Sequence, residues 1–80
     1  MTPEYERGWK QGHQTPELLR EMQSGSAQAH LDNLEYHYRV EMERTECWTD
    51  RAAATRHRDY MTGMIDHARK DLTALIQTGY

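Results

Sequence analysis

Between Ser26 and Thr62 the chain contains neither glycine nor proline, and its apolar residues recur every three or four positions. This spacing places them on one face of an α-helix, which turns once in about 3.6 residues. The first such stripe consists of Ala27, Leu31, Leu34, Tyr38 and Met42. It then fails, because Thr45, Thr49 and Arg56 occupy its next positions. The pattern predicts one long helix that ends shortly after Met42.

Apolar spacing resumes further along the chain and predicts a second long helix. Its apolar positions are Tyr60, Met61, Met64, Ile65, Ala68, Leu72, Leu75 and Ile76. We therefore predict helices over residues 26–47 and 51–77, with a reversal near Cys47–Asp50 and Thr49 or Asp50 as the N-cap of the second helix. One continuous helix from Ser26 to Gln77 is the alternative, since no strong helix breaker occupies the turn. Charge favours the hairpin, because residues 26–50 carry six acids and two bases and residues 51–80 carry five bases and three acids.

The N-terminal part spells Thr-Pro-Glu twice, at Thr2–Glu4 and Thr15–Glu17. Threonine is a favourable N-cap, proline suits the first helical position, and glutamate complements the positive end of the helix dipole. We predict short helices over residues 3–11 and 16–23, with Gly12 and Gly25 as their stops. Both are too short to be stable alone, so they must dock on a larger element. The face formed by Tyr5 and Trp9 either packs on the core or binds a partner.

The predicted fold class is all-α, with two short N-terminal helices followed by a long antiparallel hairpin in a single domain over residues 1–80. The chain has 80 residues, no phenylalanine and a net charge of −3. Large aliphatic residues are scarce, and oligomerisation is a common remedy for a thin core. We expect a homodimer that pairs two hairpins into a four-helix-type bundle.

A second apolar face supports this expectation of self-association. It lies on nearly the opposite side of the helix from the first stripe. Its members are Ala29, Tyr36, Val40 and Cys47, of which Tyr36, Val40 and Cys47 are the predicted self-association residues. The alternative is that the short N-terminal helices cover this face within one chain.

Charged side chains suggest two kinds of partner. Acids on the first long helix could contact a surface that normally holds nucleic acid, namely Asp32, Glu35, Glu43 and Glu46. The basic residues that could instead contact nucleic acid are Arg51, Arg56, Arg58, Arg69 and Lys70. We favour the acidic interface, because the isoelectric point is about 5.9 and Asp59 interrupts the basic patch. The bases around His57 are expected to pair across the hairpin with Glu41, Glu43 and Glu46.

Candidate chemistry is sparse along the chain. His37 and Glu41 lie one turn apart beside His30, and His67 and Asp71 repeat the same spacing. We interpret both pairs as solvated or hydrogen-bonded side chains that do not converge, and we expect no metal site, no cofactor and no catalytic residue. One cysteine excludes an intrachain disulfide and a cysteine-rich zinc site. Neither a signal peptide nor a membrane-spanning apolar run is evident, so we expect a cytoplasmic protein that does not contact membranes.

The short, Met-, Tyr- and charge-rich chain, which opens with YERGWKQGH, resembles the small accessory proteins of bacteriophages and other mobile elements, the anti-CRISPR-like inhibitors of host machinery. This resemblance implies a non-catalytic protein in a bacterial host, which occupies a surface of a larger protein or ribonucleoprotein complex. It assigns no role to any individual residue. A small nucleic-acid-binding regulator is the second function in view.

Overall fold

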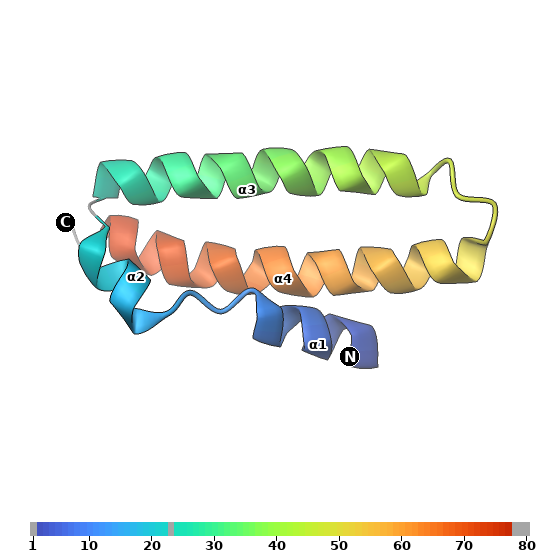
Figure 1. The fold of residues 1–80 in the computed structure, drawn as a ribbon, viewed down its shortest axis with the longest axis horizontal. Helices are drawn as coiled ribbons and strands as arrows, with labels where there is room; N and C mark the ends of the chain where they lie inside the picture. The colour runs from blue at the N-terminus through green and yellow to red at the C-terminus, as the bar shows by residue number, and fades with distance from the viewer. Residues whose placement is uncertain (1, 23, 78–80) are drawn as a thin grey trace.

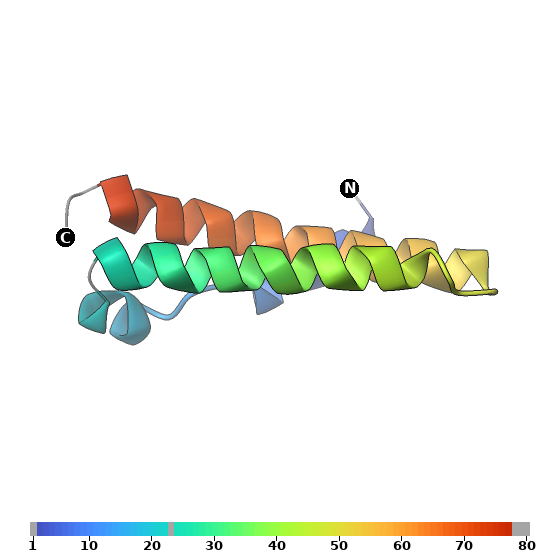
Figure 2. The same ribbon diagram turned by 90° about the horizontal axis from the view of Figure 1, so that it is seen from above.

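The computed structural model describes residues 2–22 and 24–77, which form helices α1 (Pro3–Gln11), α2 (Pro16–Glu21), α3 (Ser24–Thr45) and α4 (Arg51–Gln77). No strand occurs within these ranges. α3 and α4 lie side by side as an antiparallel hairpin, and α1 packs along α4 on the side away from α3 (Figures 1 and 2). The predicted all-α class and hairpin are therefore confirmed.

Three predicted helix caps are confirmed by hydrogen bonds. The Thr2 hydroxyl accepts from the Tyr5 N–H at 3.1 Å, and the Thr15 hydroxyl accepts from the Leu18 N–H at 3.2 Å. Asp50 Oδ1 accepts from the Ala53 N–H at 3.0 Å and so begins α4. Because α3 ends at Thr45 and α4 begins at Arg51, the alternative of one continuous helix is wrong.

The predicted helix ends need two corrections. α2 stops at Glu21 with Met22 as its C-cap, and Gly25 lies inside α3 rather than ending α2. α3 spans 24–45 rather than 26–47, because backbone hydrogen bonds from Glu46, Cys47 and Trp48 to carbonyls three residues earlier close the helix in a tighter turn.

A cluster of core residues lies where the start of α3 and the end of α4 meet α2, and Ala54, Ile65 and Ala68 continue the core along α4. Ala27, Leu31 and Leu72 are buried in this cluster. The partly buried side chains around them are Leu19, Met22, Leu34, Leu75 and Ile76. At the other end of α3, Thr45 is fully buried although the apolar stripe fails at this position. Its hydroxyl donates to the Met42 carbonyl at 2.7 Å, so the helix itself satisfies the buried polar group.

α1 docks on α4 through glycines, which allow two helix backbones to approach closely. A Cβ atom on Gly8 would lie 1.9 Å from the Tyr60 carbonyl oxygen, and one on Gly12 would lie 2.1 Å from that of Met64. Gly12 does end α1 as predicted, but its φ of −77° is right-handed. Close approach, rather than a left-handed backbone, is therefore what requires glycine at this helix end.

Candidate functional site

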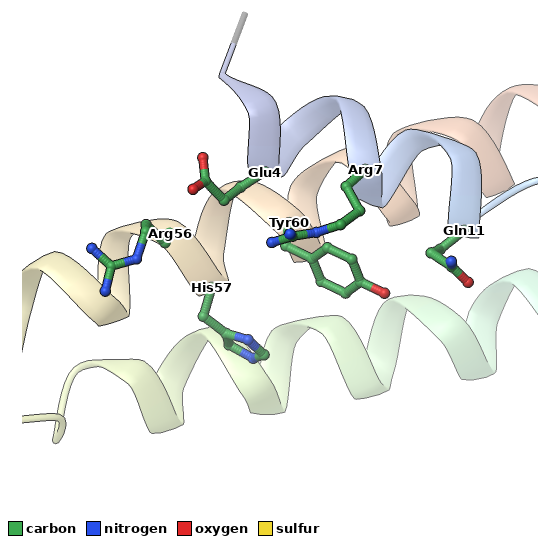
Figure 3. Close-up of a pocket in the computed structure, with 6 residues that line it drawn as sticks. All are labelled: Glu4, Arg7, Gln11, Arg56, His57 and Tyr60. Atoms are coloured by element: carbon green, nitrogen blue, oxygen red, sulfur yellow. The ribbon is translucent and has the colours of Figure 1, made fainter.

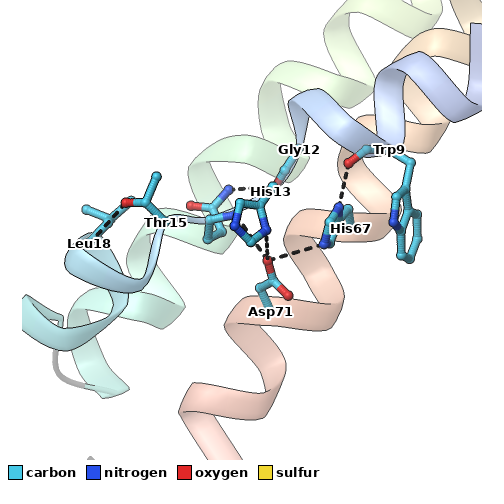
Figure 4. A network of polar contacts seen from close by, with 8 residues as sticks. Trp9, Gly12, His13, Thr15, Leu18, His67 and Asp71 are labelled. Atoms are coloured by element: carbon cyan, nitrogen blue, oxygen red, sulfur yellow. Dashed lines mark hydrogen bonds and ion pairs between the residues drawn. The ribbon is translucent and has the colours of Figure 1, made fainter.

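A polar cluster forms where the linker after α1 passes over α4 (Figure 4). His13 lies in the linker, and His67 and Asp71 lie one turn apart on α4. Asp71 Oδ2 is 3.5 Å from His67 Nε2 and 3.7 Å from His13 Nδ1. The same oxygen accepts the Gln14 backbone N–H at 3.0 Å. Asp71 Oδ2 thus lies beside both imidazoles and also accepts a backbone N–H of the linker.

α1 holds the His67 ring in a defined orientation. The Trp9 indole stacks on this imidazole with ring centroids 4.3 Å apart and planes at 15°. His67 Nδ1 donates to the Trp9 carbonyl oxygen, which can only accept. His67 and Asp71 are 13% and 18% exposed, whereas His13 is 54% exposed. The cluster therefore has two largely buried members on α4 and one accessible member in the linker.

The two pairs named from the sequence do not meet each other, but one of them meets a third residue that the sequence did not point to. His67 and Asp71 converge with His13, and ligand atoms of the three residues all lie within 4.8 Å of one another. His13 lies in a different element, 54 residues before His67, so no helical spacing relates the two. Only the docking of α1 brings it there. Among the described residues, His30, His37 and Glu41 do not form such a group.

Tyr5 makes a second polar contact between α1 and α4. Its hydroxyl donates to Asp66 Oδ2 at 2.7 Å, and its ring lies 6.4 Å from that of Trp9. The hydrogen bond to Asp66 raises the pKa of Tyr5, and desolvation and the negative charge of Asp66 raise it further. Tyr5 and Trp9 therefore pack on α4, although their outer edges also border a shallow surface pocket.

Three of the predicted acidic contacts lie on α3 and Glu46 lies in the turn just after it, and their environments differ. Glu35 pairs with Arg69 across the hairpin at 2.8 Å, and Asp32 accepts from Gln28 at 2.9 Å. Glu43 and Glu46 are exposed, and neither forms an ion pair with a described residue. We call Asp32, Glu43 and Glu46, the predicted acids that form no ion pair with a described residue, the acidic strip.

The expected pairing of bases with acids across the hairpin is found only in part. His57 Nε2 lies 3.5 Å from Glu41 Oε2, and the His57 ring stacks on Trp48 with centroids 5.1 Å apart. Glu41 also pairs with Arg44 at 3.0 Å within α3. The pairing expected for Glu43 and Glu46 is not present among the described residues, which leaves their charge facing solvent.

The basic candidates are dispersed around α4, and several have partners within the chain. Arg51 Nη1 donates to the carbonyl oxygens of the loop after α3, at 3.0 to 3.2 Å. Arg69 pairs with Glu35 and Asp66, and Lys70 lies over the Trp9 ring at 5.7 Å. Arg56 is exposed, and Arg58 is half-buried. The five residues do not form one continuous basic face.

Arg56 borders a shallow surface hollow of about 610 Å³ between α1 and α4 (Figure 3). Its lining residues are Glu4, Arg7, Gln11, Arg56, His57 and Tyr60. The Arg7 guanidinium lies over the Tyr60 ring at 5.8 Å. The hollow is wide open and is lined by acidic and basic side chains together, so its chemistry favours no particular ligand.

The predicted self-association residues lie on the outer side of α3. Tyr36 is 55% exposed, Val40 is half-buried, and Cys47 is exposed just beyond the helix. α1 packs on α4 rather than on this face, so the alternative in which the N-terminal helices cover it within one chain is not what the fold shows. Homodimer formation stays a prediction.

Comparison with known proteins found no matching family model, no similar curated protein and no similar solved structure. Within residues 2–22 and 24–77, none of the helices is both long enough and apolar enough to cross a lipid bilayer.

Proposed function

We propose that this chain is a non-catalytic interaction module that binds and blocks a larger host protein or ribonucleoprotein complex, in the manner of a phage-type inhibitor in the bacterial cytoplasm. The observation that carries the proposal is the acidic strip along α3 and the turn after it. Its carboxylates have no cationic partner among the described residues, whereas Glu35 and Glu41 are paired. Carboxylates without a cationic partner in the same chain can offer their negative charge to another molecule.

The partner that fits the acidic strip is a protein with a basic surface that normally binds nucleic acid phosphates. Complementary charge speeds association and selects the partner, and the acids compete with phosphate for the same lysine and arginine side chains. Glu43 lies in the last turn of α3, and Glu46 follows in the turn just after the helix, where its backbone N–H donates to the Glu43 carbonyl at 3.2 Å. Both side chains are exposed at this end of the hairpin. Nothing in this role requires a catalytic group or a cofactor.

Paired charge-removal variants test this proposal. The Glu43→Gln/Glu46→Gln variant removes two charges from the strip, and Glu6→Gln/Glu17→Gln removes two exposed charges from α1 and α2 as the matched control. Untagged protein is immobilised, exposed to nuclease-treated bacterial lysate, and the retained proteins are identified. We expect a nucleic-acid-binding protein that the parent and control chains retain and the strip variant loses.

The retained protein is then purified, and its binding to DNA or RNA is measured while this chain is added. Inhibition by the parent chain and not by Glu43→Gln/Glu46→Gln supports the proposal. Equal retention by both variants contradicts it. Salt-sensitive binding of DNA or RNA by the chain itself, weakened by Arg56→Ala or Arg58→Ala, would favour the second function, a nucleic-acid-binding regulator.

A further inference from the structure

We propose that His13, His67 and Asp71 form a binding site for a divalent transition-metal ion, and that Zn²⁺ is the ion that their donor atoms fit. The three ligand atoms lie within 4.8 Å of one another at the junction of the linker and α4 (Figure 4). Two imidazole nitrogens and one carboxylate oxygen are a common donor set for zinc and similar ions. Mg²⁺ and Ca²⁺ prefer sites made of oxygen ligands alone.

The hydrogen bond at the far side of the His67 ring supports this assignment. Nδ1 carries the hydrogen that is donated to the Trp9 carbonyl, so in a neutral imidazole the lone pair is on Nε2. The Nε2 atom lies 3.5 Å from Asp71 Oδ2, which is also an acceptor. Two acceptors at this distance repel unless a cation or a proton lies between them. In a metal-binding histidine, the ring nitrogen that does not bind the metal commonly donates its N–H to a backbone carbonyl, as His67 Nδ1 does.

The spacing of the ligands requires only a small adjustment. Zinc binds imidazole nitrogen at about 2.0–2.1 Å and carboxylate oxygen at about 2.0–2.2 Å, so neighbouring ligands of a tetrahedral ion are about 3.3–3.5 Å apart. Asp71 Oδ2 is already 3.5 Å from His67 Nε2 and 3.7 Å from His13 Nδ1. The half-exposed His13 side chain has freedom to complete the approach, and a fourth position is left for water.

Binding at this place would have a structural consequence. Asp71 also accepts the Gln14 N–H at 3.0 Å, so the ion would fix the linker to α4 at two successive residues. The linker joins α1 to α2, and α1 already docks through Trp9 beside the same site. Zinc would therefore stabilise the docked N-terminal part. This role is independent of the acidic strip, which lies on α3 and in the turn after it.

Calorimetric titration of the untagged full chain with Zn²⁺ tests the site. His13→Ala is the informative variant, because His13 is half-exposed and its removal should change the melting temperature of the metal-free protein by less than about 2 °C. Asp71→Asn removes the charge and keeps an acceptor for Gln14. His37→Ala, an exposed imidazole on α3, is the matched control.

We expect one Zn²⁺ per chain in the parent and in His37→Ala. The affinity for zinc should fall more than tenfold in His13→Ala and Asp71→Asn. Loss of a residue that only hydrogen-bonds to a metal ligand already costs about tenfold, and loss of a ligand itself should cost more. Zinc at about 100 times its Kd should raise the melting temperature of the parent by about 10 °C or more. Co²⁺ should give the visible absorption of a tetrahedral ion in the parent and not in His13→Ala. Absence of zinc binding in the parent, or equal affinity in His13→Ala, overturns the proposal.

Discussion

Gly8 of α1 and Gly63 of α4 meet at a helix crossing where neither backbone leaves space for a Cβ atom. A Cβ on Gly8 would lie 1.9 Å from the Tyr60 carbonyl oxygen, and one on Gly63 would lie 2.1 Å from that of Tyr5. These are backbone atoms, which cannot turn aside as a flexible side chain can. The contact sets how closely α1 approaches α4, and so it places Trp9 against His67.

Gly8→Ala and Gly63→Ala are each expected to loosen α1 from α4 and to destabilise the fold by about 1–3 kcal/mol, the usual cost of overpacking. Chemical denaturation followed by circular dichroism measures this change. Gly25→Ala is the matched control, because a Cβ there meets no atom within 4 Å and α3 is helical at that point. It should stabilise the protein by up to about 1 kcal/mol. Equal effects at all three glycines would contradict the close contact.

The hydrogen bond from Tyr5 to Asp66 predicts a pH dependence at alkaline pH. Folding raises the pKa of Tyr5 above its ordinary value of 10.0, because the protonated hydroxyl donates to a carboxylate. The bond therefore contributes its full stability below pH 10, and that contribution is lost as the pH rises through the raised pKa. Tyrosinate absorbance of the parent chain should show an ionisation above pH 10 that belongs to Tyr5.

Tyr5→Phe should abolish this ionisation and cost about 1 kcal/mol of stability at neutral pH, the usual net value of one hydrogen bond. The stability difference between Tyr5→Phe and the parent should shrink above pH 10. Tyr36→Phe, which alters an exposed tyrosine on α3, serves as control. A stability difference between parent and Tyr5→Phe that grows with alkaline pH would be inconsistent with the hydrogen bond.

Arg51 is predicted to stabilise the hairpin loop rather than to contact nucleic acid. Its Nη1 group donates to the carbonyl oxygens of Thr45, Glu46 and Trp48, and so it ties the end of α3 and the loop after it to the start of α4. Arg51→Ala should therefore destabilise the fold by about 1–3 kcal/mol. Arg56→Ala, at an exposed position on the same helix, should change stability by less than about 0.5 kcal/mol. Thermal unfolding of the two variants compares them directly, and equal melting temperatures would contradict the structural role.

The helices and the hairpin were predictable because their signals are local. Thr2, Thr15 and Asp50 cap helices through side chains that reach only three residues ahead. Apolar spacing also predicted the buried positions Leu31 and Leu72. The prediction of the boundary between α2 and α3 was less accurate. Gly25 was interpreted as the end of the second short helix, although glycine is tolerated within the first turn of a helix, where it lies in α3.

The candidate metal site was not predictable in the same way, since it depends on the docking of α1. His67 and Asp71 were visible as a pair at helical spacing, but His13 lies in a linker with no periodic relation to α4. A usable signal did exist in the glycines. Gly8 and Gly12 are four residues apart on one side of α1, a spacing that permits close helix contact, and Gly63 provides the matching position on α4. Together they would have placed the linker beside the second half of α4.

The outer side of α3 carries the last prediction, which concerns self-association. Tyr36 is 55% exposed, and α1 packs against α4 on the opposite side of the hairpin. No described helix of the same chain therefore covers the face that Tyr36 and Val40 share. Burial of this apolar surface would gain about 25 cal/mol per Å². A second copy of the chain, placed by a two-fold axis against the same face, would bury it on both copies at once.

Light scattering over a wide range of dilute concentrations measures the mass of the particle. We expect a dimer in the parent chain and a monomer in Tyr36→Glu and Val40→Glu, with helicity retained in both, since a charge at the interface opposes pairing while the hairpin core is untouched. Ala74→Glu adds the same charge at an exposed position on α4 and should leave the dimer intact. A monomeric parent chain would reject self-association, and the face around Tyr36 would then be available to the larger partner that the acidic strip is proposed to bind.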